Sequence, residues 1–202
     1  MMPRFTPFDF GVTTVMSLFH QDWIHDGETA ADVVAKYLAQ SQDEQALAVR
    51  RDARLLNRLP SPTLEVLWEA GSQYMPAFHL VGGGAEWTRT VADLCDARLA
   101  AHAEVRALTG ADAEEGAACL DAVVAEIEAV RLLPAEVRSA LTECARRCSP
   151  DLAFRVLLKA ISYAPAEITL SAARYARMEA IGSALRYGEF VVDSVAYLVE
   201  EA

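Results

Sequence analysis

The chain has 202 residues, 53% of them hydrophobic, and a formal net charge of −11 at pH 7. This hydrophobic fraction is enough to fill a core, which excludes a disordered chain. The negative net charge makes nucleic acid and anionic membrane poor partners, because phosphate binding needs clustered Lys and Arg. The apolar runs are shorter than the roughly 18 residues of a transmembrane helix, and the N-terminus lacks a signal-peptide core, so we expect a cytoplasmic protein.

The first half of the chain predicts a series of helices. In "TAADVVAKYLAQ" apolar residues recur at helical spacing after Thr29, a predicted N-cap, with Asp32 completing an imperfect capping box. Leu-rich sequence predicts a second helix over 43–59. Ser61, followed by proline, predicts the N-cap of a third helix, which should stop at Gly71.

A long helix is expected from Ala85 to a stop near Gly110, and the second half continues in the same style. Ser149, followed by proline, is a predicted N-cap, and Gly188 is a predicted helix stop. Every periodic segment matches a period of about 3.6 rather than 2, so we expect an all-α fold, either a helical bundle or stacked helical hairpins. Helices of the second half are expected near 113–131, 134–147, 150–163, 165–187 and 189–200.

Two segments suggest an internal repeat. "SPTLEVLWEAGSQYMP" at 61–76 resembles "SPDLAFRVLLKAISYAP" at 149–165, with one inserted residue. Both follow two predicted helices and end in Tyr-x-Pro. Two interpretations stay open: a degenerate duplication, or coincidence between Ala- and Leu-rich helices.

Acidic residues gather in three stretches without a neighbouring Lys or Arg in the sequence. Such stretches attract a basic partner and reject an acidic one, or they are ordinary solvated helix faces. The first stretch, 5–35, holds five carboxylates. The others hold Asp112, Glu114, Glu115, Asp121, Glu126 and Glu128, and then Glu189, Asp193, Glu200 and Glu201.

The segment "LFHQDWIHDGETAADVV", residues 18–34, contains the types of side chain that bind zinc, namely His20, Asp22, His25 and Asp26. On a helix, however, two histidines five residues apart point about 140° from each other, so they do not share a face as ligands at i and i+4 do. The sequence has no HExxH motif. We therefore expect no metal site here.

Other candidate sites have simpler interpretations. "VGGGAEW" lacks the Lys and Ser/Thr of a phosphate-binding loop, so it predicts a turn. No GxSxG motif or cysteine beside a base indicates a catalytic nucleophile. The tryptophans at 23, 68 and 87 should anchor the core. We expect reduced, mostly buried thiols at Cys95, Cys119, Cys144 and Cys148.

The opening segment also resembles a known family. "LFHQDW", a Thr-capped helix, "LPSPTLEVLWEAG", "QYMP" and a later Trp-containing helix are similar to the small helical immunity proteins (CdiI) of contact-dependent growth inhibition. The resemblance covers about residues 9–95 and divides the chain into an immunity-like domain, 1–110, and a helical extension or degenerate second copy, 111–202. The family's motif maps onto Phe19, His20, Gln21, Asp22 and Trp23, here called the box, and onto Gly71, Tyr74 and Trp87.

The resemblance implies a non-enzymatic protein, without a cofactor, that neutralises a toxin by binding the toxin's C-terminal domain, often a basic nuclease. We expect Phe19 and Trp23 to fill the core, and His20 and Asp22 to tie the loop to helix ends. The residues expected to meet the partner are Asp22, Asp26, Glu28 and Asp32. Two alternatives remain: a helical scaffold for another protein of the same cell, and a metal- or ligand-binding helical enzyme that uses the two histidines and two aspartates.

Overall fold

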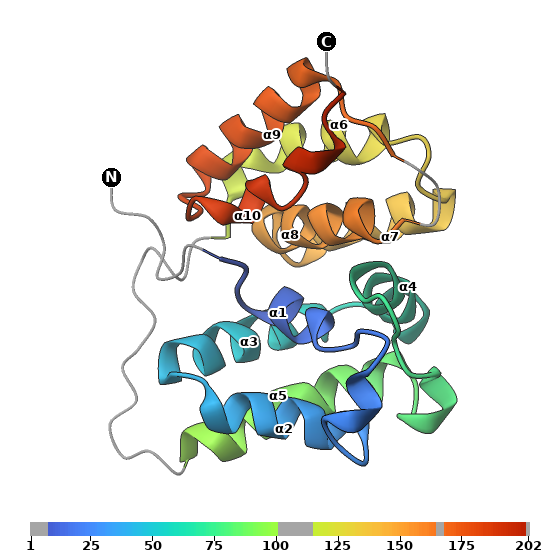
Figure 1. Cartoon of the computed structure of the whole chain (residues 1–202), viewed down its shortest axis with the longest axis vertical. Helices are drawn as coiled ribbons and strands as arrows, with labels where there is room; N and C mark the ends of the chain where they lie inside the picture. The colour runs from blue at the N-terminus through green and yellow to red at the C-terminus, as the bar shows by residue number, and fades with distance from the viewer. Residues whose placement is uncertain (1–7, 101–114, 165–167, 201–202) are drawn as a thin grey trace.

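The computed structural model describes residues 8–100, 115–164 and 168–200. Within these ranges the chain forms ten α-helices and no strand beyond an isolated bridge, which confirms the all-α prediction. The helices form two layers, with the first half of the chain in one and the second half in the other (Figure 1). A structural boundary near residue 110 lies outside the described residues.

The first layer surrounds helix α5, which packs against α2, α3 and α4. The short helix α1 closes this layer toward the second one (Figure 1). Two 3-10 turns, η1 and η2, interrupt the connecting loops. The elements are α1 Val12–Ser17, η1 Trp23–His25, α2 Ala30–Gln40, α3 Asp43–Leu56, α4 Ser61–Gly71, η2 Phe78–Leu80 and α5 Gly84–Ala100.

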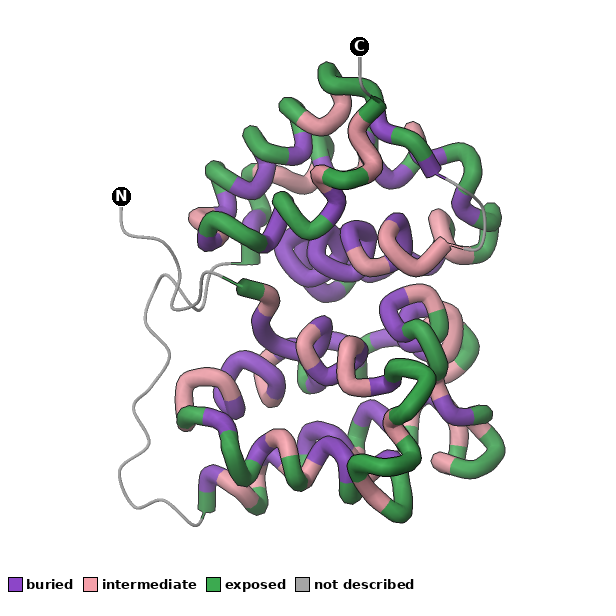
Figure 2. Tube along the Cα trace, viewed as in Figure 1, coloured by how far each residue is buried: buried purple, intermediate pink, exposed green. Residues whose placement is uncertain are grey.

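The second layer is built on α8, in which 11 of 13 residues are buried. Helix α8 packs against α6 and α7 in its own layer and against α1 and α4 in the first, so it is enclosed on both sides (Figure 2). The elements are η3 Ala117–Cys119, α6 Leu120–Ala129, α7 Ala135–Arg147, α8 Pro150–Ser162, α9 Ala172–Ala184, α10 Phe190–Asp193 and η4 Ala196–Leu198.

Helix N-termini follow the predicted chemistry in two of three cases. Thr29 and Asp32 form a complete capping box on α2. Ser149 caps α8, its hydroxyl accepting a hydrogen bond from the backbone N–H of Leu152 at 3.1 Å. Ser61 is instead the first residue of α4, and its hydroxyl accepts the N–H of Ala85 at 3.1 Å, at the start of α5. The Ser-Pro pattern therefore predicts a helix start without specifying which helix the serine caps.

The C-terminal segment differs most from the prediction. Helix α9 begins only after Ser171, which caps it, because Leu170 hydrogen-bonds in extended backbone with Leu198 and Glu200. The helix ends at Ala184, and the left-handed residue that follows is Arg186 (φ 58°), not Gly188. The single helix expected over 189–200 is divided into α10 and η4.

A buried ionic cluster joins the two layers. The Arg155 guanidinium on α8 has no exposed surface and lies 2.8 Å from Asp52 of α3 and 3.1 Å from Asp151. It also donates to the carbonyl oxygen of Phe10 at 2.6 Å. Arg51 adds a second cation, 2.7 Å from Asp52 and 3.3 Å from Asp151. Two carboxylates thus neutralise two guanidinium groups, the condition under which buried charges are tolerated.

The hydrophobic core is also continuous between the layers, since one cluster includes Trp68 and Leu64 of α4 together with Phe154 and Leu158 of α8. The two helices that carry the proposed repeat, α4 and α8, pack against each other. This contact does not test a duplication, which stays a prediction from sequence.

Candidate functional site

The box is held in place by a cluster of aromatic rings. Phe19 is fully buried, and its ring meets the edges of Trp23 and Trp87 at centroid distances of 5.6 and 5.7 Å. Trp87 in turn meets Trp68 at 5.7 Å. Phe19 is therefore a core residue, as predicted, while Trp23 is only half-buried and covers the edge of the core.

The other residues of the family resemblance converge on the same place. The backbone N–H of Tyr74 donates to the carbonyl oxygen of Phe19 at 2.8 Å, which joins the segment after α4 to the box. Gly71 ends α4 against Met16, where an added Cβ would lie 2.2 Å from the Met16 sulfur. A larger residue at position 71 would push α4 away from α1.

The polar members of the box do not tie the loop to helix ends. Asp22 donates its backbone N–H to Nδ1 of His20 at 3.2 Å, and Nε2 of His20 lies 3.6 Å from Asp26. Gln21 reaches only Asp22, at 3.5 Å. These contacts stay within the turn because the box runs directly into the 3-10 turn η1, and all four side chains are exposed.

Two of the four expected partner-binding acids are held by an ion pair or a helix cap. Asp26 lies 3.1 Å from Nζ of Lys36, and the hydrogen bond and charge of this lysine lower the pKa of Asp26. Asp32 accepts hydrogen bonds from the backbone and hydroxyl of Thr29. The expectation that no base neutralises this segment is therefore wrong for Asp26. Asp22 and Glu28 still face solvent.

Beside the box lies a pocket of about 510 Å³, here called the box pocket. The residues that line it include Trp23, Trp87, Glu28 and Glu86. Leu80 of η2 stands at its edge and is 71% exposed.

Two further apolar side chains are exposed on the segments that form this pocket. Ile24, next to Trp23 on η1, is 62% exposed, and Tyr74 is 49% exposed. We call the box pocket together with Ile24, Tyr74 and Leu80 the box surface. Neither Glu28 nor Glu86, the two acids in the pocket wall, has a hydrogen bond or ion pair with another described residue. Sequence analysis missed Glu86 and Leu80, because the fold alone brings η2 and α5 beside the box.

Metal and phosphate sites find little support in the geometry. Within residues 8–100, 115–164 and 168–200, no group of three or more His, Cys, Asp or Glu side chains is placed to hold a metal ion. The glycine-rich start of α5 is already satisfied, since Glu65 accepts the N–H of Gly84 at 3.0 Å and Ser61 accepts that of Ala85. "VGGGAEW" is thus a turn into a helix capped by its neighbour.

The second acidic stretch is also partly neutralised in the folded protein. Glu126 is 4% exposed and pairs with Arg177 and Arg174 of α9. The basic partners come from about 50 residues away in the chain, so the local absence of Lys and Arg did not predict a free charge. Asp112 and Glu114 lie outside the described residues, while Asp121 and Glu128 are exposed.

Comparison with known proteins gave no match among protein-family models, curated proteins or solved structures. In the described part of the chain, no helix is both long and apolar enough to cross a membrane.

Proposed function

We propose that this protein is a cytoplasmic immunity protein, which binds a basic toxin domain through the box surface and blocks it without catalysis. The observation that carries the proposal is the box pocket, where the 71% exposed Leu80 and the half-buried Trp23 lie with Glu28 and Glu86, two carboxylates without an ion pair to another described residue. The sequence resemblance of the box to growth-inhibition immunity proteins is a separate argument for the same function.

The arrangement of the box surface resembles that of a protein interface. Apolar and aromatic side chains at the centre of an interface supply most of the binding energy, while charges at the rim steer the approach and exclude wrong partners. Here Leu80, Ile24 and Tyr74 provide the exposed apolar area, and Glu28 and Glu86 provide negative charge beside it. A partner with an apolar anchor surrounded by Lys and Arg would fit this surface.

Co-expression with a toxin tests the function. The toxin domain tested should be the C-terminal domain of any large secreted protein found to be encoded beside this one, and the wild-type protein should rescue growth. The double variant Ile24→Asp/Leu80→Asp should lose rescue, because two buried charges would enter the interface. Leu132→Asp, at a leucine 59% exposed in the other layer, is the matched control and should still rescue.

The outcomes test separately whether the protein is an immunity protein and whether the box surface is its contact with the toxin. Failure of the wild-type protein to rescue would contradict the immunity function itself. Rescue by the Ile24→Asp/Leu80→Asp variant would leave the function standing and reject the box surface as the contact. Binding to a resident protein of the same cell, without rescue, would favour the scaffold alternative.

Association kinetics test the role of charge. Glu28→Lys/Glu86→Lys should slow association with the toxin domain and weaken its salt dependence, since exposed charges act over about 8–10 Å at physiological salt. The control Asp121→Lys/Glu128→Lys makes the same charge change on α6. An equal loss in both variants would mean that only the net charge steers binding.

A further inference from the structure

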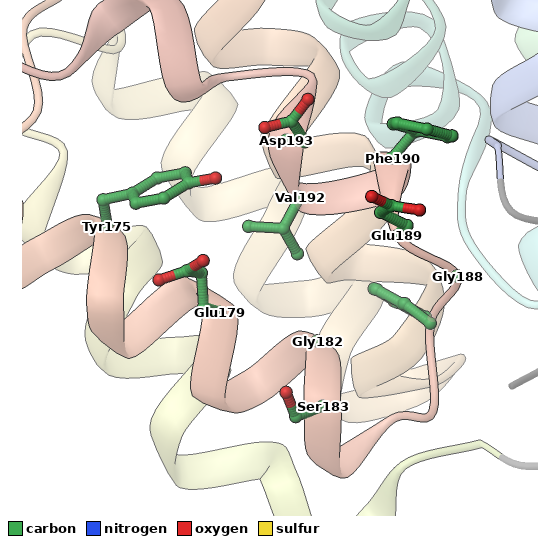
Figure 3. A pocket seen from close by; sticks show the side chains of 10 residues that line it. Tyr175, Glu179, Gly182, Ser183, Gly188, Glu189, Phe190, Val192 and Asp193 are labelled. Atoms are coloured by element: carbon green, nitrogen blue, oxygen red, sulfur yellow. The ribbon is translucent and has the colours of Figure 1, made fainter. Parts of the chain in front are cut away.

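A second pocket, of about 330 Å³, lies between α9 and the segment that forms α10 (Figure 3). Its volume is at the low end of the roughly 300–1,000 Å³ of ligand pockets, which suits one long side chain better than a large ligand. The pocket belongs to the layer that lacks the box (Figure 1). Its lining consists of Tyr175, Glu179, Gly182, Ser183, Tyr187, Gly188, Glu189, Phe190, Val192 and Asp193.

The floor and the aromatic walls of this pocket are fixed by packing. Gly182 lets α9 approach α10, since an added Cβ would lie 2.6 Å from Val192. The hydroxyl of Tyr187 donates to Asp151 at 2.9 Å, and its ring stacks on Phe154 at 6.2 Å. Phe190, at the rim, stacks on Phe8 at 5.0 Å. A ligand would therefore meet rings that are already ordered, which lowers the entropic cost of binding.

All the charged side chains that line this pocket are negative. Glu179, Glu189 and Asp193 are exposed, and none of them has a hydrogen bond or ion pair with another described residue. Among the residues that line the pocket, none is Lys or Arg. Burial, together with the charges of Glu179 and Asp193, raises the pKa of Tyr175, as expected where negative potential is not neutralised.

We propose that this pocket binds the guanidinium or ammonium group of an Arg or Lys side chain presented by a polypeptide partner. The carboxylates supply ionic hydrogen bonds to such a group, and aromatic faces attract the same cation through the ring quadrupole. The cavity between ordered aromatic side chains, and not the charge alone, carries the proposal. The proposal does not depend on the identity of the toxin or on the box surface.

An NMR titration of the whole protein with capped amino acids tests the pocket. N-acetyl-argininamide should cause saturable shifts in the amide resonances of Gly182, Gly188 and Val192, and N-acetyl-lysinamide should act on the same residues. N-acetyl-citrullinamide has nearly the shape of the arginine probe but no charge, so it should cause shifts at least fivefold smaller. Equal shifts from the arginine and citrulline probes would overturn the proposal.

Variants assign the effect to this pocket. Glu179→Gln/Asp193→Asn keeps the shape of both side chains and should lower the affinity for the arginine probe at least fivefold. Asp121→Asn/Glu128→Gln on α6 should leave this affinity unchanged. An equal loss in both variants would reduce the effect to general charge and reject the site. Tighter binding of spermidine than of either capped amino acid would assign the pocket to free polyamines and overturn the side-chain source.

Discussion

Arg155 shows how strongly a single residue depends on its surroundings. Its guanidinium is fully buried and donates hydrogen bonds to Asp52 and the Phe10 carbonyl from the first layer and to Asp151 of its own helix. Gly11 makes room for this arrangement, because an added Cβ would lie 1.9 Å from the Asp52 carboxylate and the residue has a φ of 68°. The first layer therefore supplies Asp52, Arg51 and the Phe10 carbonyl, and the second layer supplies Arg155 and Asp151.

Replacing Arg155 by Met should lower the free energy of unfolding by about 3–5 kcal/mol, because the buried carboxylates of Asp52 and Asp151 then share only one cation, Arg51. Arg54→Met is the matched control. Arg54 is 58% exposed where it pairs with Asp96, so its loss should cost about 1 kcal/mol or less. Urea denaturation measures both, and similar values for the two variants would contradict a stabilising role for the buried cluster.

The four cysteines should differ in reactivity. Burial raises the pKa of Cys95 to about 12, and the side-chain hydrogen bond between Cys144 and Cys148, together with burial, raises the pKa of Cys144. Since the thiolate is the reactive form, these thiols should be inert at neutral pH, and only the half-buried Cys119 should react quickly with a disulfide reagent. We expect one fast thiol in the native protein, lost in Cys119→Ser, and four after denaturation.

Helix ends are where the elements of this protein depend on one another. The first backbone N–H groups of α5 are not capped by the preceding loop but by Ser61 and Glu65 of α4. The glycine at position 84 permits this, because an added Cβ would lie 2.7 Å from the carbonyl oxygen of Ser61. The contact fixes α5, and with it Trp87 of the box pocket, against α4.

Ser61→Ala should therefore loosen α5 rather than its own helix. We expect the free energy of unfolding to fall by about 1 kcal/mol, as for the loss of other helix caps, and hydrogen exchange at the Ala85 amide to become faster. Ser149→Ala should instead speed exchange at Leu152, within its own helix α8. Faster exchange at the start of α4 in the Ser61 variant would mean that this serine caps its own helix after all.

In the described residues, a shared hydrophobic core and a buried ionic cluster join the two layers. This arrangement predicts that the halves do not unfold separately. Glu143 of α7 adds a further link, since it accepts a hydrogen bond from Thr63 of α4 at 2.9 Å.

Two probes can test this cooperativity. All three tryptophans lie in the first half of the chain, so fluorescence reports that half, while far-ultraviolet circular dichroism reports helices of both. The two urea transitions should coincide, as they do for a two-state domain. A fluorescence midpoint clearly apart from the dichroism midpoint would show two units that unfold independently.

The sequence by itself determined the all-α class, most helix positions, and several helix caps and core residues. Thr29 and Ser149 were identified as caps, and Phe19, Trp68 and Trp87 as core residues, because each depends on neighbours three or four positions away. The same reasoning failed at Leu170, which pairs in extended backbone with Leu198 and Glu200, and over 189–200, where the expected helix is divided in two.

Only the tertiary structure decided which charges are free. Lys36 neutralises Asp26, and Arg177 neutralises Glu126 from the far end of the chain. Meanwhile Glu86 joins Glu28 at the box pocket although 57 positions separate them in the sequence. Periodicity records which face of a helix is apolar, but an ion pair depends on distances of a few ångströms between side chains, and the packing of distant helices sets those distances.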